Sequence, residues 1–324
     1  MAQPLLQVQD LRTQFFTTRG VVHAVDGVTF HVDAGETLGV VGESGCGKTM
    51  TALSILRLLP DPGKIMSGRI LFRGKDVTKM TDEEIRDFRG NDVAMIFQDP
   101  MTSLNPVTRI GSQIEEAMTA HERFTETLAR GRVIELLKRV RVPAAESRVK
   151  DYPHQFSGGM RQRAMIAMGL SNEPDLLIAD ELGTALDVSI QDQILEELRE
   201  LVRTQGLSVL YITHNLGVAR LVSDRIYVMY GGEIAEVAPT AAMFSRQLHP
   251  YSQGLLAAIP RLSGSIGEGI EGRIPDYIDP PPACRFAPRC PFRMAICDQQ
   301  RPLLAASEPG RLAACHLYPA STRR

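Results

Sequence analysis

The chain is built from short apolar runs that are separated by glycine, proline and polar residues. Four runs have the length and composition of buried strands: 37–41, 93–97, 175–180 and 208–213. Between the last two runs, apolar residues recur at helical spacing, which predicts a helix that packs one face on a sheet. These residues are Ile190, Ile194, Leu198, Leu201 and Val202. Strands that alternate with helices predict an α/β fold with a mostly parallel sheet covered on both faces.

Other segments carry more local signals. Residues 48–59 read as a helix that stops at the following prolines, and Thr81 with Glu84 forms a capping box at the start of another helix. The region from about 100 to 160 is polar and rich in helix formers, so it is expected to be a helical insertion between two strands. Residues 225–237 predict a hairpin that turns at two glycines. From about 260 onward the sequence becomes rich in proline and glycine.

Composition narrows the class of protein. The 324 residues carry a net charge of −2 and a pI near 6.4, so there is no electrostatic case for nucleic-acid binding. The start MAQPLLQVQDLR lacks the pattern of a signal peptide, and no stretch reaches the roughly 18 to 20 apolar residues that cross a bilayer. We therefore expect a soluble cytosolic protein, in which clustered thiols serve as metal ligands or reactive groups rather than disulfides.

The stretch GESGCGKT at 42–49 matches the pattern of a phosphate-binding loop. Its glycines let backbone N–H groups curl around phosphate oxygens, and the following helix adds its positive end. Lys48 is expected to reach the β- and γ-phosphates and Thr49 to hold Mg²⁺. The predicted loop comprises Gly42, Glu43, Ser44, Gly45, Cys46, Gly47, Lys48 and Thr49, with Cys46 as a small spacer.

A second element is LLIADE, an apolar strand that ends in two carboxylates. Asp180 is expected to bind Mg²⁺, and Glu181 to act as the general base that polarises an attacking water. Alone, such a strand end is often only a strand that meets solvent.

With FSGGMRQR at 156–163, the motif set GESGCGKT, LLIADE and ITHN resembles the ATP-binding subunits of ATP-binding cassette (ABC) transporters. The resemblance implies an ABC-type P-loop nucleotide-binding domain with a mixed sheet and a helical subdomain. It implies an ATPase domain over 1–258, with the helical insertion at about 100–160. A small extension rich in cysteine and proline follows over 259–324.

The resemblance also assigns roles to single residues. Ser157, Gly158 and Gly159 match the signature loop, which in this family caps the ATP held by the partner chain of a head-to-tail dimer. Gln98 matches the Q-loop, which senses the γ-phosphate and is a further Mg²⁺ ligand. Asp187 in TALD matches the D-loop at the dimer seam, and His214 in ITHN matches the switch histidine. Phe15 matches the aromatic residue that stacks on adenine, with Phe16 as the fallback.

Two departures from the family pattern stand out. Leu182 and Gly183 follow the carboxylates where Pro-Thr is usual, so the turn loses its rigid proline and gains a flexible glycine. Asn215 follows the histidine where aspartate is common. A degenerate, non-hydrolysing subunit would lose Glu181 or His214, and both are present, so we expect a competent site with altered rate or coupling.

The stretches DPMTSLNP at 99–106 and HPYSQGLLAAIP at 249–260 resemble the oligopeptide/dipeptide import branch. The resemblance implies a complex of a substrate-binding protein, two permease subunits and a second, non-identical ATPase chain. This chain would lie on the cytoplasmic face of the inner membrane as a peripheral subunit. An importer of nickel, glutathione or another small solute is the alternative, because permease and binding protein choose the substrate. A soluble ABC ATPase in translation or DNA repair is a further alternative.

Four of the five cysteines lie in the tail with the spacing C-x5-C-x6-C-x17-C. These are Cys284, Cys290, Cys297 and Cys315. Structural zinc sites have tighter pairs, whereas iron–sulfur clusters tolerate wider spacing, and some members of the resembled branch carry a [4Fe–4S] cluster here. The cluster, zinc and free thiols all stay open, with a structural role expected for the tail. Arg285, Arg289 and Arg293 between these cysteines are expected either to face partner carboxylates or to lie on a solvated surface.

Overall fold

The computed structural model describes residues 3–121, 124–183, 187–259, 269–272, 274–275 and 277–318. The chain folds as two compact units. The first unit comprises Met1–Asp33, Thr37–Lys79 and Ile212–Arg324, and the second comprises Ala34–Glu36 and Met80–Tyr211. The predicted phosphate-binding loop and the cysteine-rich tail therefore belong to one unit.

The first unit contains an antiparallel sheet with the order β2-β1-β4-β5. Its strands are β1 Leu6–Thr17, β2 Gly20–Val32, β4 Gly63–Phe72 and β5 Lys75–Asp76. In β1 every second side chain near the start is buried, among them Leu6 and Val8, as expected for a sheet with one covered face. The predicted α/β alternation does not include these strands, whose alternation is interrupted by register shifts at 8–12.

A second run of strands in the first unit has the order β11-β12-β10-β9-β3. Its strands are β3 Thr37–Val41, β9 Arg225–Tyr230, β10 Glu233–Pro239, β11 Ala305–Glu308 and β12 Arg311–Ala313. β3 pairs in parallel with β9, whereas β9 pairs antiparallel with β10, so the sheet is mixed as predicted. The predicted hairpin turns at Gly231 and Gly232, and all five residues of β3 are buried, which accounts for its unbroken apolar sequence.

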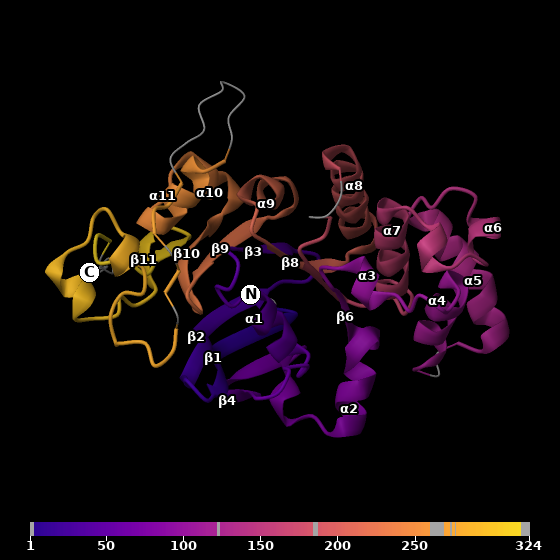
Figure 1. Ribbon diagram of the computed structural model, residues 1–324, viewed down its shortest axis with the longest axis horizontal. Coiled ribbons are helices and arrows are strands. Elements are labelled where there is room, and N and C mark those ends of the chain that lie inside the picture. Colours follow the sequence, from indigo (N-terminus) through magenta and orange to yellow (C-terminus); the bar gives the residue numbers. More distant parts are fainter. Residues whose placement is uncertain are drawn as a thin grey trace. The chain divides into compact units, whose positions relative to one another are not determined.

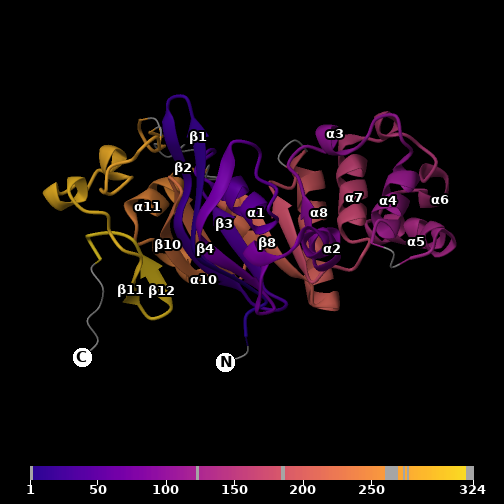
Figure 2. The ribbon, with the colours of Figure 1, turned by 90° about the horizontal axis from the view of Figure 1, so that it is seen from below.

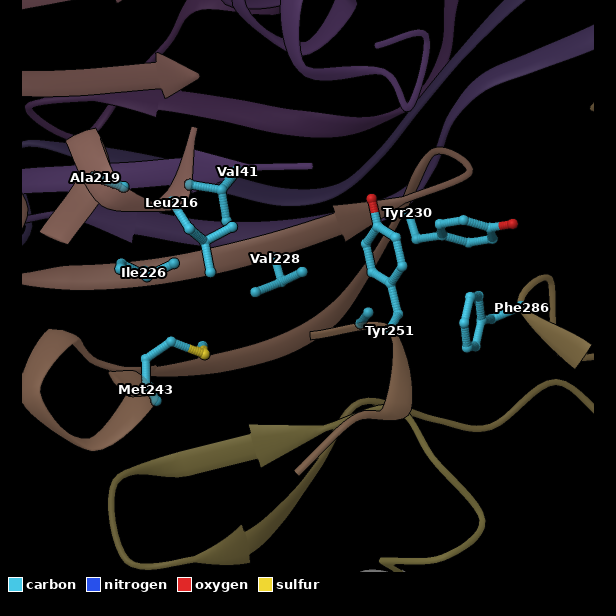
Figure 3. Packing of buried hydrophobic residues seen from close by; sticks show 11 residues of the cluster. Val41, Leu216, Ala219, Ile226, Val228, Tyr230, Met243, Tyr251 and Phe286 are labelled. Atoms are coloured by element: carbon cyan, nitrogen blue, oxygen red, sulfur yellow. The ribbon is translucent and has the colours of Figure 1, made fainter. Parts of the chain in front are cut away.

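Helices of the first unit lie beside this run of strands (Figure 1). They are α1 Lys48–Ile55, α9 Leu216–Val222, α10 Thr240–Ser245 and α11 Pro250–Ala257. Val41, Leu216, Val228 and Met243 form a buried cluster with the rings of Tyr230, Tyr251 and Phe286 (Figure 3). The Tyr230 ring centroid lies 4.6 Å from that of Tyr251 and 5.2 Å from that of Phe286. The tail thus contributes Phe286 to the core of the first unit.

The tail also extends the sheet of the first unit. β12 pairs with β10, and Figure 2 shows β11 and β12 in yellow beside it. The fully buried carboxylate of Glu236 in β10 accepts the backbone N–H groups of Leu248 and His249, each at 2.9 Å, and pairs with Arg311 of β12 at 2.9 Å. These hydrogen bonds and the ion pair compensate the cost of burying the Glu236 charge. The pair of Glu236 and Arg311 therefore fixes the tail to the sheet. No strand was predicted in the tail.

The second unit holds the strand order β8-β7-β6, formed by β6 Val93–Ile96, β7 Leu176–Asp180 and β8 Ser208–Thr213, with the last two residues of β8 assigned to the first unit. Its helices are α2 Asp82–Asp87, α3 Pro100–Ser103, α4 Ile110–Thr119, α5 Glu126–Arg139, α6 Ala145–Arg148, α7 Gly158–Gly169 and α8 Val188–Gln205. The predicted capping box of Thr81 and Glu84 starts α2. The predicted helical subdomain is present: α3 to α7 lie between β6 and β7, with α7 running on to Gly169, and Figure 1 shows α4 to α7 together in magenta.

Helix α8 buries the face that its sequence predicted. Ile194, Leu198 and Leu201 are buried, and Ile190 and Val202 are half-buried. A buried ion pair joins Arg163 of α7 to Glu197 of α8, and the same guanidinium donates to the carbonyl of Val140 at 2.7 Å. This ion pair fixes the middle of α7 to α8. In the described residues, no helix has both the length and the apolar character needed to cross a membrane.

Candidate functional site

The loop 42–49 lies between the end of β3 and the start of α1, as predicted. Gly47 precedes the helix with φ = +104°, a backbone conformation that favours glycine. A Cβ there would lie 2.3 Å from the carbonyl oxygen of Ala24, and a Cβ at Gly42 would lie 2.2 Å from that of Met229. The glycines therefore let the loop pack closely on neighbouring backbone, while Ser44, Gly45 and Thr49 remain exposed.

Lys48 folds back over this loop. Its Nζ donates to the carbonyls of Gly42 at 2.8 Å and Glu43 at 3.0 Å, and its side chain is almost fully buried. The ammonium group thus lies against the loop backbone that the motif assigns to phosphate binding. Cys46 is 1% exposed, and burial raises the pKa of its thiol, so it stays a neutral spacer.

Two further predicted residues belong to the first unit. Phe15 lies near the end of β1, half-buried, and its ring approaches Gly63 of the paired strand β4. Phe16 is 43% exposed. His214 follows β8 and is exposed, and Asn215 caps α9 by accepting the backbone N–H of Gly217 at 2.8 Å. Asn215 therefore has a structural role of its own, which an aspartate could also fill.

In the second unit, the structure brings Gln98 and Glu181 together. Gln98 follows β6 and Glu181 follows β7, and because these parallel strands are neighbours their ends meet at one edge. Gln98 Nε2 donates to Glu181 Oε2 at 2.7 Å. Asp180 is the last residue of β7 and is 2% exposed. The arrangement places two carboxylates and one amide at the same end of two neighbouring strands. This set of groups suits Mg²⁺ binding and proton transfer.

The turn after these carboxylates has an unusual backbone. Glu181 has φ = +53°, which is strained for a residue with a side chain, and Gly183 has φ = +82°. Gly183 is thus required by the turn, not only tolerated there. Leu182 is buried and its carbonyl accepts the hydroxyl of Tyr211 at 3.4 Å. Burial, with the nearby Glu181 carboxylate, raises the pKa of Tyr211, so the hydroxyl remains a donor.

The predicted signature residues form the start of α7. Ser157 caps the helix, and its Oγ accepts the backbone N–H of Met160 at 3.3 Å. Ser157 and Gly158 are exposed, and Gly159 is buried against Ile190 of α8. Ser157 and Gly158 thus place the start of α7 at an accessible surface, and the start of a helix suits an anion.

Asp187 precedes α8 and is exposed. The rest of the predicted D-loop stretch, residues 184–186, lies outside the described residues.

The four tail cysteines line one small cavity, together with the rings of His249, Phe286 and Phe292. Burial raises the pKa of Cys284 to about 11 and also raises the pKa of Cys290 and Cys315. Among the described residues, no group of three or more His, Cys, Asp or Glu side chains is arranged to hold a metal ion. The donor type fits a thiolate-ligated group, but the described structure does not contain a closed ligand set.

The sequence did not indicate the contacts that residues from distant parts of the chain make around the loop 42–49. Tyr251 of α11 accepts the backbone N–H of Glu43 at 2.8 Å, and Arg289 of the tail pairs with its carboxylate. Arg285 is also buried and pairs with Asp26, whereas Arg293 is half-exposed and pairs with Asp298. The interpretation of Arg285 and Arg289 as solvated surface is therefore wrong, because both side chains pair with carboxylates of their own chain. No spacing in the sequence indicates contacts this far apart.

Two sequence families match the chain. The family described as "ABC transporter" matches residues 25–183, and the family described as "Oligopeptide/dipeptide transporter, C-terminal region" matches residues 235–297.

Similar proteins extend over most of the chain. The dipeptide transport ATP-binding protein DppD of Bacillus subtilis (strain 168) is 50% identical over 303 residues, covering 93% of this chain and 90% of that protein. The oligopeptide transport ATP-binding protein AppD of the same organism is 49% identical over 317 residues, covering 97% of each.

Solved structures share the fold. The chain aligns with the dimeric ATP-binding cassette MJ0796, solved in a post-hydrolysis state with ADP and phosphate, at a TM-score of 0.66 and 24% identity. That alignment covers 75% of this chain and 100% of the other. It aligns with cbiO1 from Clostridium perfringens at a TM-score of 0.65 and 26% identity, covering 76% of this chain and 92% of the other.

Proposed function

The chain belongs to the ABC transporter family of ATP-binding proteins, and from this premise we propose that it is the ATP-hydrolysing subunit of an importer of dipeptides or oligopeptides. The proposal rests on the loop 42–49, in which Lys48 at the start of α1 donates to the backbone carbonyls of Gly42 and Glu43. The relatives named for dipeptide and oligopeptide transport, and the match of the C-terminal family, support the substrate class.

ATP binding would use the groups of the loop. Backbone N–H groups of Ser44 to Lys48 and the start of α1 would surround the β- and γ-phosphates, and Lys48 would exchange its carbonyl partners for phosphate oxygens. We propose that Phe15 stacks on adenine. Bound Mg²⁺ would neutralise phosphate charge, held by Thr49, Asp180 and Gln98.

Hydrolysis would follow at the γ-phosphate. Glu181 would take a proton from the attacking water, and the products would be ADP and phosphate. Gln98 already donates to Glu181 at 2.7 Å, which orients the carboxylate. We propose that His214 contacts the γ-phosphate, and that Ser157, Gly158 and Gly159 cap the nucleotide of a second ATPase chain while Asp187 lies at their seam.

Transport would be driven by differential binding. ATP would favour the closed pair of ATPase chains, and loss of the γ-phosphate would open it. We propose that this chain lies on the cytoplasmic face of the inner membrane, bound to two permease subunits, with a second, non-identical ATPase chain and a substrate-binding protein as further partners. The helical insertion α3 to α7 is the proposed docking surface for the permeases.

The test of this assembly is co-purification. A tagged chain, solubilised with its membrane in mild detergent, is expected to retain two permeases and a second ATPase, and its ATP hydrolysis is expected to rise when peptide-loaded binding protein is added. Stimulation by a nickel- or glutathione-loaded binding protein instead would assign another solute. Recovery of the chain without any membrane protein would contradict the proposal and favour a soluble ATPase.

We further propose that residues 1–258 form the ATPase domain and that residues 259–324 form an extension whose cysteines hold a [4Fe–4S] cluster, with zinc as the alternative. The support is the donor chemistry: four thiols line a single cavity. Because burial raises the pKa of three of these thiols, uptake of a metal would release protons. The group would have a structural role and takes no part in hydrolysis.

Anaerobic purification, followed by iron, sulfide and zinc analysis and a visible absorption spectrum, tests this extension. About four irons and about four sulfides per chain are expected, with both lost in Cys284→Ser. One zinc per chain would replace the cluster and keep the structural role. A metal-free tail that unfolds at the same temperature in the wild type and in Cys284→Ser would contradict it.

A further inference from the structure

Arg289 of the tail forms an ion pair with the carboxylate of Glu43 in the loop 42–49. Arg289 Nη1 lies 2.7 Å from Glu43 Oε2, and Arg289 Nη2 lies 3.0 Å from Glu43 Oε1, so the pair is bidentate. The Arg289 side chain is 4% exposed. A bidentate pair between arginine and a carboxylate fixes both position and orientation.

The other donors of Arg289 are also used. Nε donates to the carbonyl of Glu271 at 3.0 Å, Nη2 to that of Ile270 at 3.3 Å, and Nη1 to the hydroxyl of Tyr230 at 3.4 Å. The guanidinium lies 5.8 Å from the centroid of the Tyr230 ring. An arginine guanidinium stays protonated in proteins, so the charge of Arg289 is permanent. Arg289 is therefore anchored on the tail side and cannot move away from Glu43 without losing several contacts.

Glu43 connects this arginine to the proposed phosphate site. Its backbone N–H donates to the hydroxyl of the buried Tyr251 at 2.8 Å, and its carbonyl accepts Lys48 Nζ at 3.0 Å. Glu43 thus contacts three parts of the first unit: its side chain binds the tail, its N–H binds α11, and its carbonyl binds Lys48. A shift of Arg289 would act directly on the residue that helps to position Lys48.

Arg289 is held by the short segment 284–290, which begins and ends with a cysteine. Its turn is closed by backbone bonds from Ala287 to Cys284 at 3.0 Å and from Cys290 to Ala287 at 3.3 Å. At the other end of the segment, Arg285 pairs with Asp26 and donates to the carbonyl of Gly231. The turn that contains Gly231 also supports the loop, because the N–H of Gly232 donates to the carbonyl of Cys46 at 2.8 Å.

We propose that the segment 284–290 clamps the phosphate-binding loop, and that Arg289 is a positioning residue for nucleotide because it neutralises and orients Glu43. The inference rests on the proposed binding of ATP by this loop. A carboxylate in a loop that binds a triphosphate adds like charge where the ligand brings its own, and Arg289 cancels that charge. The two cysteines at the ends of the segment would set the position of Arg289, so the state of the tail and the affinity for ATP would be linked.

The test is the affinity of the full-length chain for Mg·ATP, measured by titration calorimetry. Arg289→Ala is expected to weaken binding about fivefold to tenfold, because it leaves Glu43 charged beside the phosphates. The double variant Glu43→Gln with Arg289→Ala is expected to recover most of that loss. A role of Arg289 in folding alone would not predict this recovery, since the double variant lacks both partners of the ion pair.

Arg293→Ala is the matched control. Arg293 lies in the same tail, is half-exposed and pairs with Asp298 rather than with a residue of the loop, so ATP affinity is expected to stay unchanged. If Arg289→Ala fails to fold, Arg289→Lys decides the question, because lysine keeps the charge but cannot form the bidentate pair that orients Glu43. Arg289→Lys is expected to bind ATP about threefold to fivefold more weakly than the wild type, and wild-type affinity in a folded Arg289→Lys chain would contradict the positioning role.

Three results would overturn the inference: wild-type affinity in Arg289→Ala, no recovery in the double variant, or a tenfold loss in Glu43→Gln alone. The link to the cysteines has its own test. Replacing Cys284 and Cys290 by serine is expected to weaken ATP binding in the wild type but to add nothing to Arg289→Ala. Additive losses would break that link. A wild-type chain that does not bind ATP at all would refute the proposed function instead.

Discussion

Replacing Glu181 by glutamine is expected to slow ATP hydrolysis about 10³-fold while ATP still binds. The amide keeps the size of the side chain and the contact with Gln98, but it cannot accept the proton of the attacking water. Because binding depends on the loop 42–49 and not on Glu181, the affinity for ATP should be close to that of the wild type. The measurement is steady-state phosphate release by the purified chain, together with calorimetric titration of Mg·ATP.

Glu196→Gln is the matched control for this variant. Glu196 lies on α8 in the same unit, is 67% exposed and pairs with Arg199 at 3.3 Å, so the same chemical change there should leave hydrolysis unaltered. A Glu181→Gln chain that hydrolyses ATP at the wild-type rate would show that another group is the base. The strained φ of +53° at Glu181 supports a functional role, since such strain persists where the surrounding structure requires it.

Replacing Lys48 by alanine is expected to weaken ATP binding about 10²-fold, the equivalent of roughly 3 kcal/mol. The variant loses a charge-assisted contact to phosphate, and the loop loses the bonds to the carbonyls of Gly42 and Glu43 that hold its shape. Hydrolysis should fall with binding, because unbound ATP does not react. Calorimetric titration of Mg·ATP measures the change.

Lys79→Ala serves as the control for Lys48→Ala. Lys79 belongs to the same unit, is 75% exposed and lies 3.8 Å from Asp76, so its loss removes one positive charge without touching the loop. Thermal unfolding of both variants separates lost binding from lost structure. Unchanged affinity in Lys48→Ala, with a fold as stable as that of the wild type, would refute the phosphate-binding assignment of the loop.

Local sequence patterns predicted much of the fold. The apolar run at 37–41 forms β3, the helical stripe of 189–202 lies within α8, and the capping box starts α2, because each depends on neighbours close in sequence. The antiparallel strands β1 and β2 were not predicted. Their alternation is interrupted by register shifts, and the pairing of β1 with β4 joins residues far apart in the chain.

The site was predictable to a similar extent. Motif spacing located the loop, the two carboxylates and the start of α7, since backbone geometry there depends on glycine and on strand ends. It could not reveal that Arg289 would bind Glu43, 246 residues away, or that Tyr251 would hold the same residue. Contacts of this kind depend on the tail packing around Phe286, which no periodicity in the sequence indicates.

Uptake into vesicles measures whether this chain drives the import of peptides with ATP. Vesicles would contain this chain with its permeases and second ATPase, with ATP on the side of the ATPase chains and a peptide-loaded binding protein on the other. A labelled dipeptide or oligopeptide is expected to accumulate with ATP and not to accumulate with a non-hydrolysable ATP analogue. Accumulation of nickel or glutathione without peptide, or peptide uptake that continues with the analogue, would contradict this expectation.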